Sequence, residues 1–192
     1  KIPGFIPFNP PRKTRAGHWI IGGEVGWEQA AVALCSDDNF SRWEVVIIPR
    51  PPEIVLLYPE TTLMDQGDRL LAILRPRQVT WAPLSVSLDE GRTWSPLRLS
   101  NFPLCSSKTL CRRLSTGQHI LISNNAVENR RLLSIAVTRP GEKTFCRVWK
   151  LRHQAFPKRR LLGGTGNAPK NFVGALTEWS YPAAVEWNGN LY

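Results

Sequence analysis

The chain of 192 residues carries 25 Lys and Arg against 15 Asp and Glu, a formal net charge of +10. Its apolar fraction of 42% is that of a globular protein with a real core, which excludes collagen and low-complexity disorder. No run reaches the roughly 18–20 apolar residues that a membrane helix needs, so the sequence predicts no membrane span. The charge favours anionic partners, and a basic solvated surface explains it as simply.

Glycines that precede short apolar runs recur with a period of 50 residues. Gly17, Gly67 and Gly117 are followed by HWIIGG, DRLLAIL and QHILIS, and Gly189 precedes a fourth run after a longer interval. A glycine before such a run is typical of the tight turn between two antiparallel strands. The period therefore predicts repeated β units.

A second marker keeps almost the same period. The segments 36–43, 87–94 and 138–145 begin 51 residues apart, and each ends on an aromatic residue. The middle copy reads SLDEGRTW, in which Asp89 can accept backbone N–H bonds and Gly91 permits a positive φ. The closing Trp is expected to pack between sheets. Phe40 and Glu142 replace the glycine in the other copies, which predicts turns of a different shape there.

Each unit reads as four short antiparallel strands. In the second unit the predicted strands are 61–64, 69–74, 84–87 and a fourth near 96–99, with a tight turn at 65–68. Four strands in about 40–50 residues are typical of a β-propeller blade. The sequence thus predicts an all-β fold of roughly three and a half four-stranded blades, in a piece of a longer chain. The predicted units lie near 17–57, 58–104, 105–160 and 178–192.

The cysteines show no metal-binding pattern. No CxxC occurs, and no His lies at zinc-finger spacing from a cysteine. The sequence predicts no metal site and no cofactor.

SxDxGxTW is the Asp-box motif, and longer stretches around it resemble the sialidase (neuraminidase) superfamily. These stretches are 59–75, 129–138 and 180–192, and they are closest to bacterial exo-α-sialidase-like proteins with Asp-box (BNR) repeats. The order Glu60, Arg75, Arg130, Tyr181 matches the order of the family's site residues. The resemblance implies a six-bladed β-propeller of sialidase type.

Strand order predicts where these residues meet. Glu60 and Arg75 flank one hairpin, so they emerge at the end of the sheet opposite its turn. Arg130 precedes a third strand and Tyr181 a first strand, which places both at the same end, opposite the Asp boxes. Residues at corresponding places in other units, Glu24 and Asn125 among them, are predicted to line the same mouth. 

The residue types suit an acidic sugar. Arginine binds carboxylates with a planar, permanently charged fork. A neutral tyrosine avoids the repulsion that a carboxylate nucleophile would meet beside the sugar's own carboxylate. The resemblance implies Tyr181 as nucleophile, Glu60 as its base, and Arg75 and Arg130 as carboxylate binders. It also implies a retaining exo-glycosidase whose partner is a glycan with a terminal sialic acid or related acidic sugar.

Two family residues have no match in this chain, a third Arg and an acid/base Asp. Arg12, Arg15 and Asp37 lie early in the sequence, but none sits in a recognisable motif. Either the blades that carry them precede Lys1, or the protein lacks them. The second case favours a non-catalytic propeller that binds a glycan or a protein. No nucleic-acid motif is present, so no nucleic-acid partner is predicted.

Overall fold

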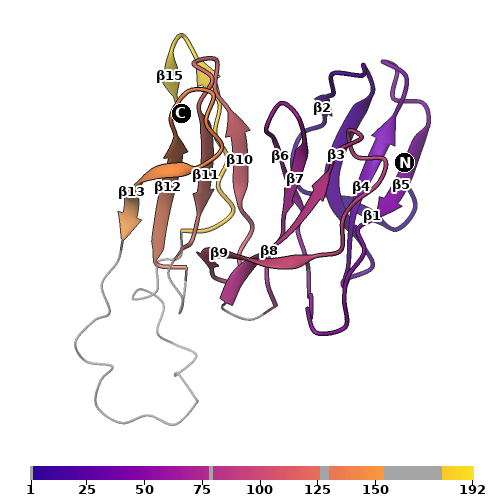
Figure 1. The fold of residues 1–192 in the computed structure, drawn as a ribbon, viewed down its shortest axis with the longest axis horizontal. Coiled ribbons are helices and arrows are strands. Elements are labelled where there is room, and N and C mark those ends of the chain that lie inside the picture. Colours follow the sequence, from indigo (N-terminus) through magenta and orange to yellow (C-terminus); the bar gives the residue numbers. More distant parts are fainter. Residues whose placement is uncertain (1, 78–79, 126–129, 154–178) are drawn as a thin grey trace, which may run out of the picture.

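The computed structural model describes residues 2–77, 80–125, 130–153 and 179–192. All regular secondary structure in these ranges is β-strand, so the prediction of an all-β fold is confirmed. The described ranges contain no helix long and apolar enough to cross a membrane. Figure 1 shows separate antiparallel sheets that stand beside one another.

The first sheet has five strands in four positions. Two short strands share the first position because both pair with β3, in the order β1–β3–β4–β5. Both precede Gly17 and so extend the sheet beyond the expected start of the unit. The strands are β1 (Phe5–Pro7), β2 (Arg12–Lys13), β3 (Trp19–Val25), β4 (Gln29–Cys35) and β5 (Trp43–Ile47).

The second sheet contains the four strands read from the sequence, in the order β6–β7–β8–β9. The first two agree closely with prediction, whereas β8 begins earlier and β9 continues further toward the next sheet. The turn between β6 and β7 is closed by Asp65, whose Oδ1 accepts the Gly67 N–H at 2.8 Å. The strands are β6 (Thr62–Asp65), β7 (Leu70–Ile73), β8 (Thr80–Ser87) and β9 (Arg98–Leu104).

The third sheet repeats this order, and a two-stranded hairpin follows. The outermost strand, β13, is the longest of the described strands, and its side chains are mostly exposed. The strands are β10 (Leu110–Arg113), β11 (His119–Ser123), β12 (Leu132–Thr138), β13 (Phe145–His153), β14 (Glu186–Trp187) and β15 (Asn190–Leu191).

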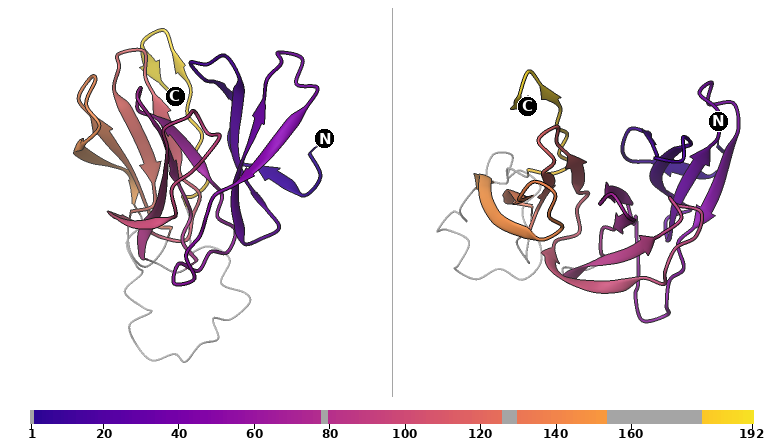
Figure 2. Two further views of the ribbon diagram at one scale, coloured as in Figure 1. Left: turned by 45° about the vertical axis from the view of Figure 1, so that its right-hand side comes forward. Right: turned by 45° about the horizontal axis from the view of Figure 1, so that its top comes forward.

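The two largest clusters of buried apolar residues in the described ranges lie between sheets. One cluster joins Ile20 and Val32 of the first sheet to Leu70 of the second, and another joins Met64 of the second to Leu121 of the third. The views in Figure 2 show the sheets fanned around a common side. There β6, the first strand of the second sheet, lies beside both β3 and β10. This arrangement directs the ends of the inner strands toward one region.

Gly22 on β3 allows the first two sheets to approach closely. A Cβ at this position would lie 2.4 Å from the carbonyl oxygen of Thr61, a distance that real Cβ atoms do not adopt. Thr61 directly follows Glu60, so this contact sets the distance between β3 and the segment that carries Glu60. A glycine is therefore required where the two backbones meet.

The first Asp box begins one residue earlier than predicted. Cys35 occupies the position that Ser87 has in the second box. The Cys35 thiol contacts Asp37 Oδ2 at 3.4 Å, just as the Ser87 hydroxyl donates to Asp89 Oδ1 at 2.8 Å. Asp37 then accepts the N–H of Ser41, four residues on, at 3.1 Å. The sequence match was shifted because a thiol replaces the hydroxyl.

The Asp-box turns otherwise follow their expected logic. Asp89 accepts both the N–H and the hydroxyl of Thr93, at 2.9 and 2.6 Å. Trp94 is 7% exposed and packs in the cluster between the first two sheets, as predicted. Phe40 has a φ of 56°, in the left-handed region, but it lies three residues after Asp37, whereas Gly91, with a φ of 98°, lies two residues after Asp89. The left-handed residue therefore takes a different place in the two turns.

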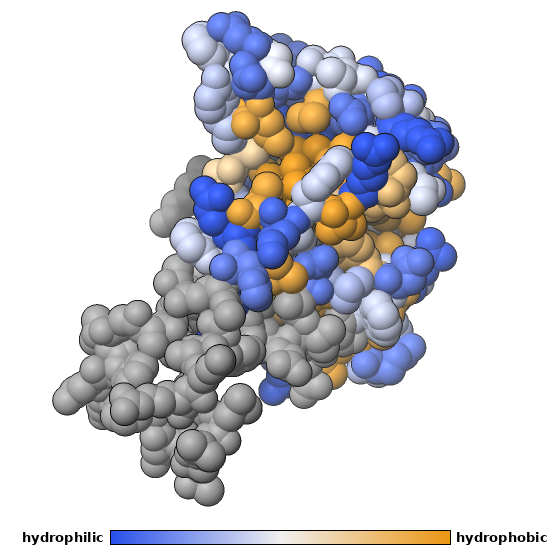
Figure 3. Space-filling model, turned by 90° about the vertical axis from the view of Figure 1, so that its left-hand side faces the viewer, coloured by the Kyte–Doolittle hydropathy of each residue, from blue (hydrophilic) through white to orange (hydrophobic). Residues whose placement is uncertain are grey.

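The outer face of the third sheet is apolar. Leu133 and Ile135 on β12 and Ile120 on β11 point away from the second sheet and form a separate cluster. Trp149 on β13 pairs with Ile135, lies on the same face and is 47% exposed. Figure 3 shows apolar surface gathered on this side of the molecule. Sheets with two apolar faces are stable when each face meets a neighbour, which is the principle of a propeller.

Candidate active site at the mouth of the sheets

The candidate site lies where the inner strands end, opposite the Asp boxes; this end is called the mouth. Glu60 precedes β6 and Arg75 follows β7, while Arg130 precedes β12 and Tyr181 lies upstream of β14. The structure brings these four predicted residues together. They come from three successive units: Glu60, Arg75 and Arg130 lie within two residues of a strand end, and Tyr181 lies in the segment that leads to β14.

Glu60 is the centre of the cluster. Its Oε1 accepts hydrogen bonds from Arg75 Nη1 at 2.7 Å and from the Tyr181 hydroxyl. Arg75 Nη1 also lies 3.1 Å from the Tyr181 oxygen. The Glu60 side chain is 3% exposed, and its Oε2 has no hydrogen-bond partner among the described residues. A carboxylate and a guanidinium thus share a small, largely buried volume, and the phenol of Tyr181, which is 45% exposed, meets them at the surface.

Arg130 lies beside the ring of Tyr181. Its guanidinium carbon lies 5.7 Å from the centre of the Tyr181 ring. Its Nε and Nη2 donate to the carbonyl oxygen of Ser106, at 3.3 and 2.9 Å. The phenol therefore lies between two arginines, of which one contacts its oxygen and the other its ring.

The segment that carries Tyr181 is anchored by its backbone. The Trp179 N–H donates to the Arg130 carbonyl at 2.9 Å, and Asn124 Nδ2 donates to the Trp179 carbonyl at 2.7 Å. Asn124 is fully buried and also donates to the carbonyl of Leu132 at 3.0 Å. This asparagine therefore ties β11, β12 and the Tyr181 segment together at the mouth.

The two further predicted lining residues have different positions. Glu24 is 1% exposed, and its Oε2 accepts the backbone N–H of Glu60 at 3.3 Å. It holds the backbone of Glu60 in place and does not face an open surface. Asn125 follows β11 at the mouth, is partly buried, and its Oδ1 finds no partner among the described residues.

Burial and charge shift the titration of groups at the mouth. Burial raises the pKa of Tyr181, and the hydrogen bond and negative charge of Glu60 raise it further against the opposing charges of Arg75 and Arg130. Burial also raises the pKa of Glu24. The pKa of Lys108 is lowered by burial, and the charge of Glu60 opposes that change. At neutral pH the phenol is therefore protonated and needs a base to act as a nucleophile.

The backbone at the two central residues is unusual. Glu60 has a φ of 43° and Tyr181 a φ of 57°, the left-handed region that non-glycine residues seldom occupy. Such conformations cost about 1–3 kcal/mol and gather at functional sites. This strain is an observation independent of any sequence motif.

The aspartates, which are the residue type expected for the general acid, lie away from the mouth. All aspartates of the chain sit in Asp boxes or in the β6–β7 turn, at the end opposite the mouth: Asp37, Asp38, Asp65, Asp68 and Asp89. Arg15 is at that end as well, paired with Glu90 at 3.3 Å. Arg12 on β2 donates to the Leu63 carbonyl and lies away from Tyr181. None of these early residues joins the cluster.

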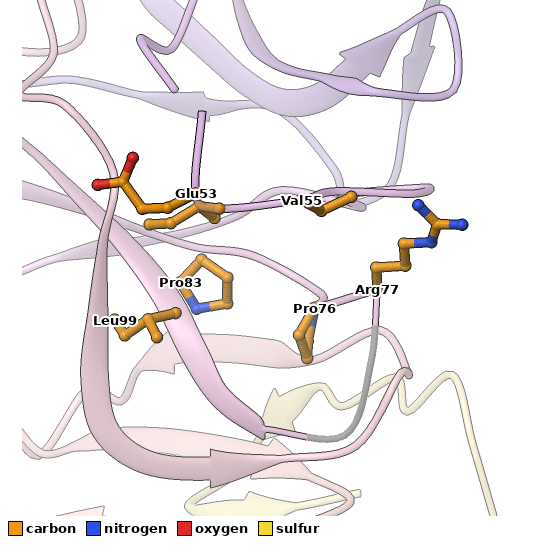
Figure 4. A pocket seen from close by; sticks show the side chains of 7 residues that line it. Glu53, Val55, Pro76, Arg77, Pro83 and Leu99 are labelled. Atoms are coloured by element: carbon orange, nitrogen blue, oxygen red, sulfur yellow. The ribbon is translucent and has the colours of Figure 1, made fainter. Parts of the chain in front are cut away.

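One hollow elsewhere in the fold, shown in Figure 4, has a volume of about 290 Å³ and is lined mainly by apolar residues of the 53–55 loop, Pro76, Pro83 and Leu99. Its two charged residues, Glu53 and Arg77, direct their charged ends away from its centre in that view. Among the described residues, no three His, Cys, Asp or Glu side chains gather as metal ligands would.

Sequence reasoning missed one residue of this site, Ser106. It lies between β9 and β10 in a Ser-Ser pair that belongs to no motif. Its Oγ accepts a hydrogen bond from Arg75 Nε at 3.0 Å. Nothing in the sequence marks a serine whose role depends on two distant arginines.

Comparisons with known proteins agree with this architecture. The BNR repeat-like domain family matches residues 2–192, and no curated protein matches the chain. The chain is similar to the Hadza microbial sialidase Hz136, with 13% identity and a TM-score of 0.60 over 80% of this chain and 32% of that one. A mutant of Trypanosoma rangeli sialidase displaying trans-sialidase activity is 11% identical, with a TM-score of 0.58 over 93% and 27%.

A mutant of the NanB sialidase from Streptococcus pneumoniae is 14% identical, with a TM-score of 0.52 over 69% of this chain and 21% of that one. At such identities the likeness shows the fold: the chain has the architecture of a sialidase-type β-propeller. It spans about a third of the length of the first of these proteins and less of the others.

Proposed function

The chain belongs to the BNR repeat-like domain family, and on that premise we propose that it contributes to a retaining exo-glycosidase of sialidase type. The substrate is a glycan that ends in a sialic acid or a related acidic sugar. The observation that carries the proposal is the contact of Glu60 Oε1 with both the Tyr181 hydroxyl and Arg75. A tyrosine with a carboxylate base and flanking arginines suits attack beside a carboxylate.

The first step forms a glycosyl–tyrosine bond. The Tyr181 oxygen attacks the anomeric carbon as its proton passes to Glu60, and the bond from that carbon to the leaving oxygen breaks. The raised pKa of Tyr181 makes this transfer necessary, because free phenolate is scarce at neutral pH. The second step reverses the first with water as nucleophile, so the sugar leaves with its configuration retained.

Arg75 and Arg130 hold the sugar's carboxylate. Arginine donates charge-assisted N–H bonds to a carboxylate, which orients the sugar and balances its charge. Because both guanidinium groups flank Tyr181, a carboxylate bound there lies close to the attacking oxygen. The same arginines stabilise the phenolate character that develops during attack.

The leaving oxygen needs a proton from a general acid. No aspartate of the chain lies at the mouth, so under this proposal the general acid is not one of the chain's own aspartates. The same observation favours a second candidate function, a non-catalytic propeller that binds acidic glycans at this mouth. The two candidates share the arginine site and differ in the release of product.

The experiment follows hydrolysis of a fluorogenic sialoside by the natural protein of which this chain is all or part. The enzyme proposal expects turnover with retained configuration, read by NMR, and its loss in Tyr181→Phe. Tyr58→Phe is the matched control, because the Tyr58 ring also lies beside Arg75, at 5.6 Å, but does not contact Glu60 in this way. Sialoside binding without release by the wild type supports the second candidate, and normal turnover by Tyr181→Phe excludes the mechanism.

A further inference from the structure

Ser106 contacts both candidate carboxylate-binding arginines. Its Oγ accepts from Arg75 Nε at 3.0 Å, and its carbonyl oxygen accepts from Nε and Nη2 of Arg130 at 3.3 and 2.9 Å. These arginines are 55 positions apart in sequence and come from neighbouring sheets. One residue between β9 and β10 thus joins the two.

The hydroxyl contact limits how the Arg75 guanidinium can turn. Arg75 is held at Nε by Ser106 and at Nη1 by Glu60 and Tyr181, so its plane is fixed at two of its three nitrogens. None of the described residues accepts a hydrogen bond from its third nitrogen, Nη2. A guanidinium fixed in this way presents Nη2 to a ligand in one orientation, whereas a guanidinium held only by Glu60 can rotate about that contact.

We infer that Ser106 is a positioning residue that orients Arg75 toward the carboxylate of the bound sugar. This inference rests on the proposed function, since it concerns the acidic ligand of the same site. Ser106 touches the ligand only through Arg75. Its carbonyl sets Arg130 independently of the side chain, so a substitution at Ser106 isolates the hydroxyl contact to Arg75.

The neighbouring residue offers a matched control. Ser107 is fully buried, and its Oγ has no hydrogen-bond partner among the described residues. Ser107→Ala removes the same atom one position away without touching an arginine. Ser106→Thr restores the hydroxyl and serves as the conservative rescue of Ser106→Ala.

The test compares two ligands by calorimetry on the natural protein, N-acetylneuraminic acid and its uncharged methyl ester. Ser106→Ala should weaken binding of the acid about five- to tenfold, the size of one lost hydrogen bond of ordinary strength, and leave the ester within about twofold. Ser106→Thr should recover most of the loss, and Ser107→Ala should change neither ligand. Equal weakening of acid and ester, or no weakening of the acid, overturns the inference.

A second readout separates this inference from the proposed function. The Arg75 Nε–H signal in NMR should exchange slowly with solvent in the wild type, faster in Ser106→Ala, and slowly again in Ser106→Thr. If the wild type does not bind the acid, the proposed function fails, and this signal still decides the role of Ser106. An exchange rate unchanged by Ser106→Ala contradicts that role.

Discussion

Arg75 and Glu60 form an ion pair at the mouth, with 2.7 Å between Nη1 and Oε1 and side chains only 13% and 3% exposed. A backbone hydrogen bond also joins the two ends of the hairpin that carries these residues, because the Arg75 N–H donates to the Pro59 carbonyl at 2.8 Å. Two oppositely charged groups so little exposed depend on each other, because either one alone would be a buried charge without its partner.

Removing one partner of this pair should therefore destabilise the protein. Arg75→Met is expected to lower the free energy of unfolding by about 2–4 kcal/mol, because it leaves the Glu60 carboxylate unpaired. Arg75→Met combined with Glu60→Gln should cost less than the sum of the single changes. Denaturant unfolding of the four proteins in this cycle measures the coupling, and strictly additive costs would contradict a functional ion pair.

The titration of Tyr181 should depend on Glu60. Glu60→Gln removes a negative charge and a charge-assisted hydrogen bond that both raise the pKa of Tyr181, so this pKa should fall. The measurement is the ultraviolet titration of phenolate, taken as the difference between each protein and its Tyr181→Phe variant. A Tyr181 pKa that rises or stays constant argues against the contact.

The first Asp box should contribute stability that is lost in acid. Hydrogen bonds from the backbone and side chain of Ser41 lower the pKa of Asp37 to about 2 from a reference value of 3.8. The ionised form is favoured by folding, so its contribution is complete above about pH 4 and disappears as the pH falls through about 2. Acid unfolding of Asp37→Asn should lack this component. Glu28→Gln, at an exposed turn, should unfold as the wild type does, and identical acid profiles for both variants would refute the prediction.

A methyl group at Gly22 should disturb the site from a distance. Gly22→Ala places a Cβ 2.4 Å from the Thr61 carbonyl, so β3 and the Glu60 segment must move apart. The expected loss of stability is about 1–3 kcal/mol, with weaker binding of an acidic sugar. Gly26→Ala is the control, because its Cβ meets nothing within 4 Å although its φ is 55°. Gly26→Ala should lower the free energy of unfolding by about 1 kcal/mol and bind the sugar normally. Equal sugar binding by the two variants would contradict the prediction.

The sequence was informative wherever geometry follows from strand order. Glu60 and Arg75 flank one hairpin, so their meeting required only that the strands pair, and Arg130 and Tyr181 follow from the repeat. Glu24 was expected to face ligand and instead accepts the Glu60 N–H, because burial at a close sheet contact leaves no trace in a single sequence. The roles of these residues remain predictions that the structure supports by proximity.

Two residues escaped for chemical reasons. Ser106 acts partly through its carbonyl oxygen, which every residue has, so no side-chain pattern could reveal it. Cys35 occupies the serine position of the first Asp box with a thiol. Because Ser36 is the nearest serine, the motif was aligned one residue too late in the sequence. Both cases show that hydrogen bonding to the backbone, or by an uncommon donor, is invisible to motif matching.

The most direct test of the account is to capture the bond to Tyr181. A sialosyl fluoride with a second fluorine beside the anomeric carbon slows release of the sugar from the nucleophile, and mass spectrometry of proteolytic peptides then locates the adduct. In the natural protein we predict one added fluorosialosyl group on the peptide that contains Tyr181, absent in Tyr181→Phe and strongly reduced in Glu60→Gln. An adduct on another residue, or hydrolysis of this reagent at full rate by Tyr181→Phe, would contradict the proposed role of Tyr181.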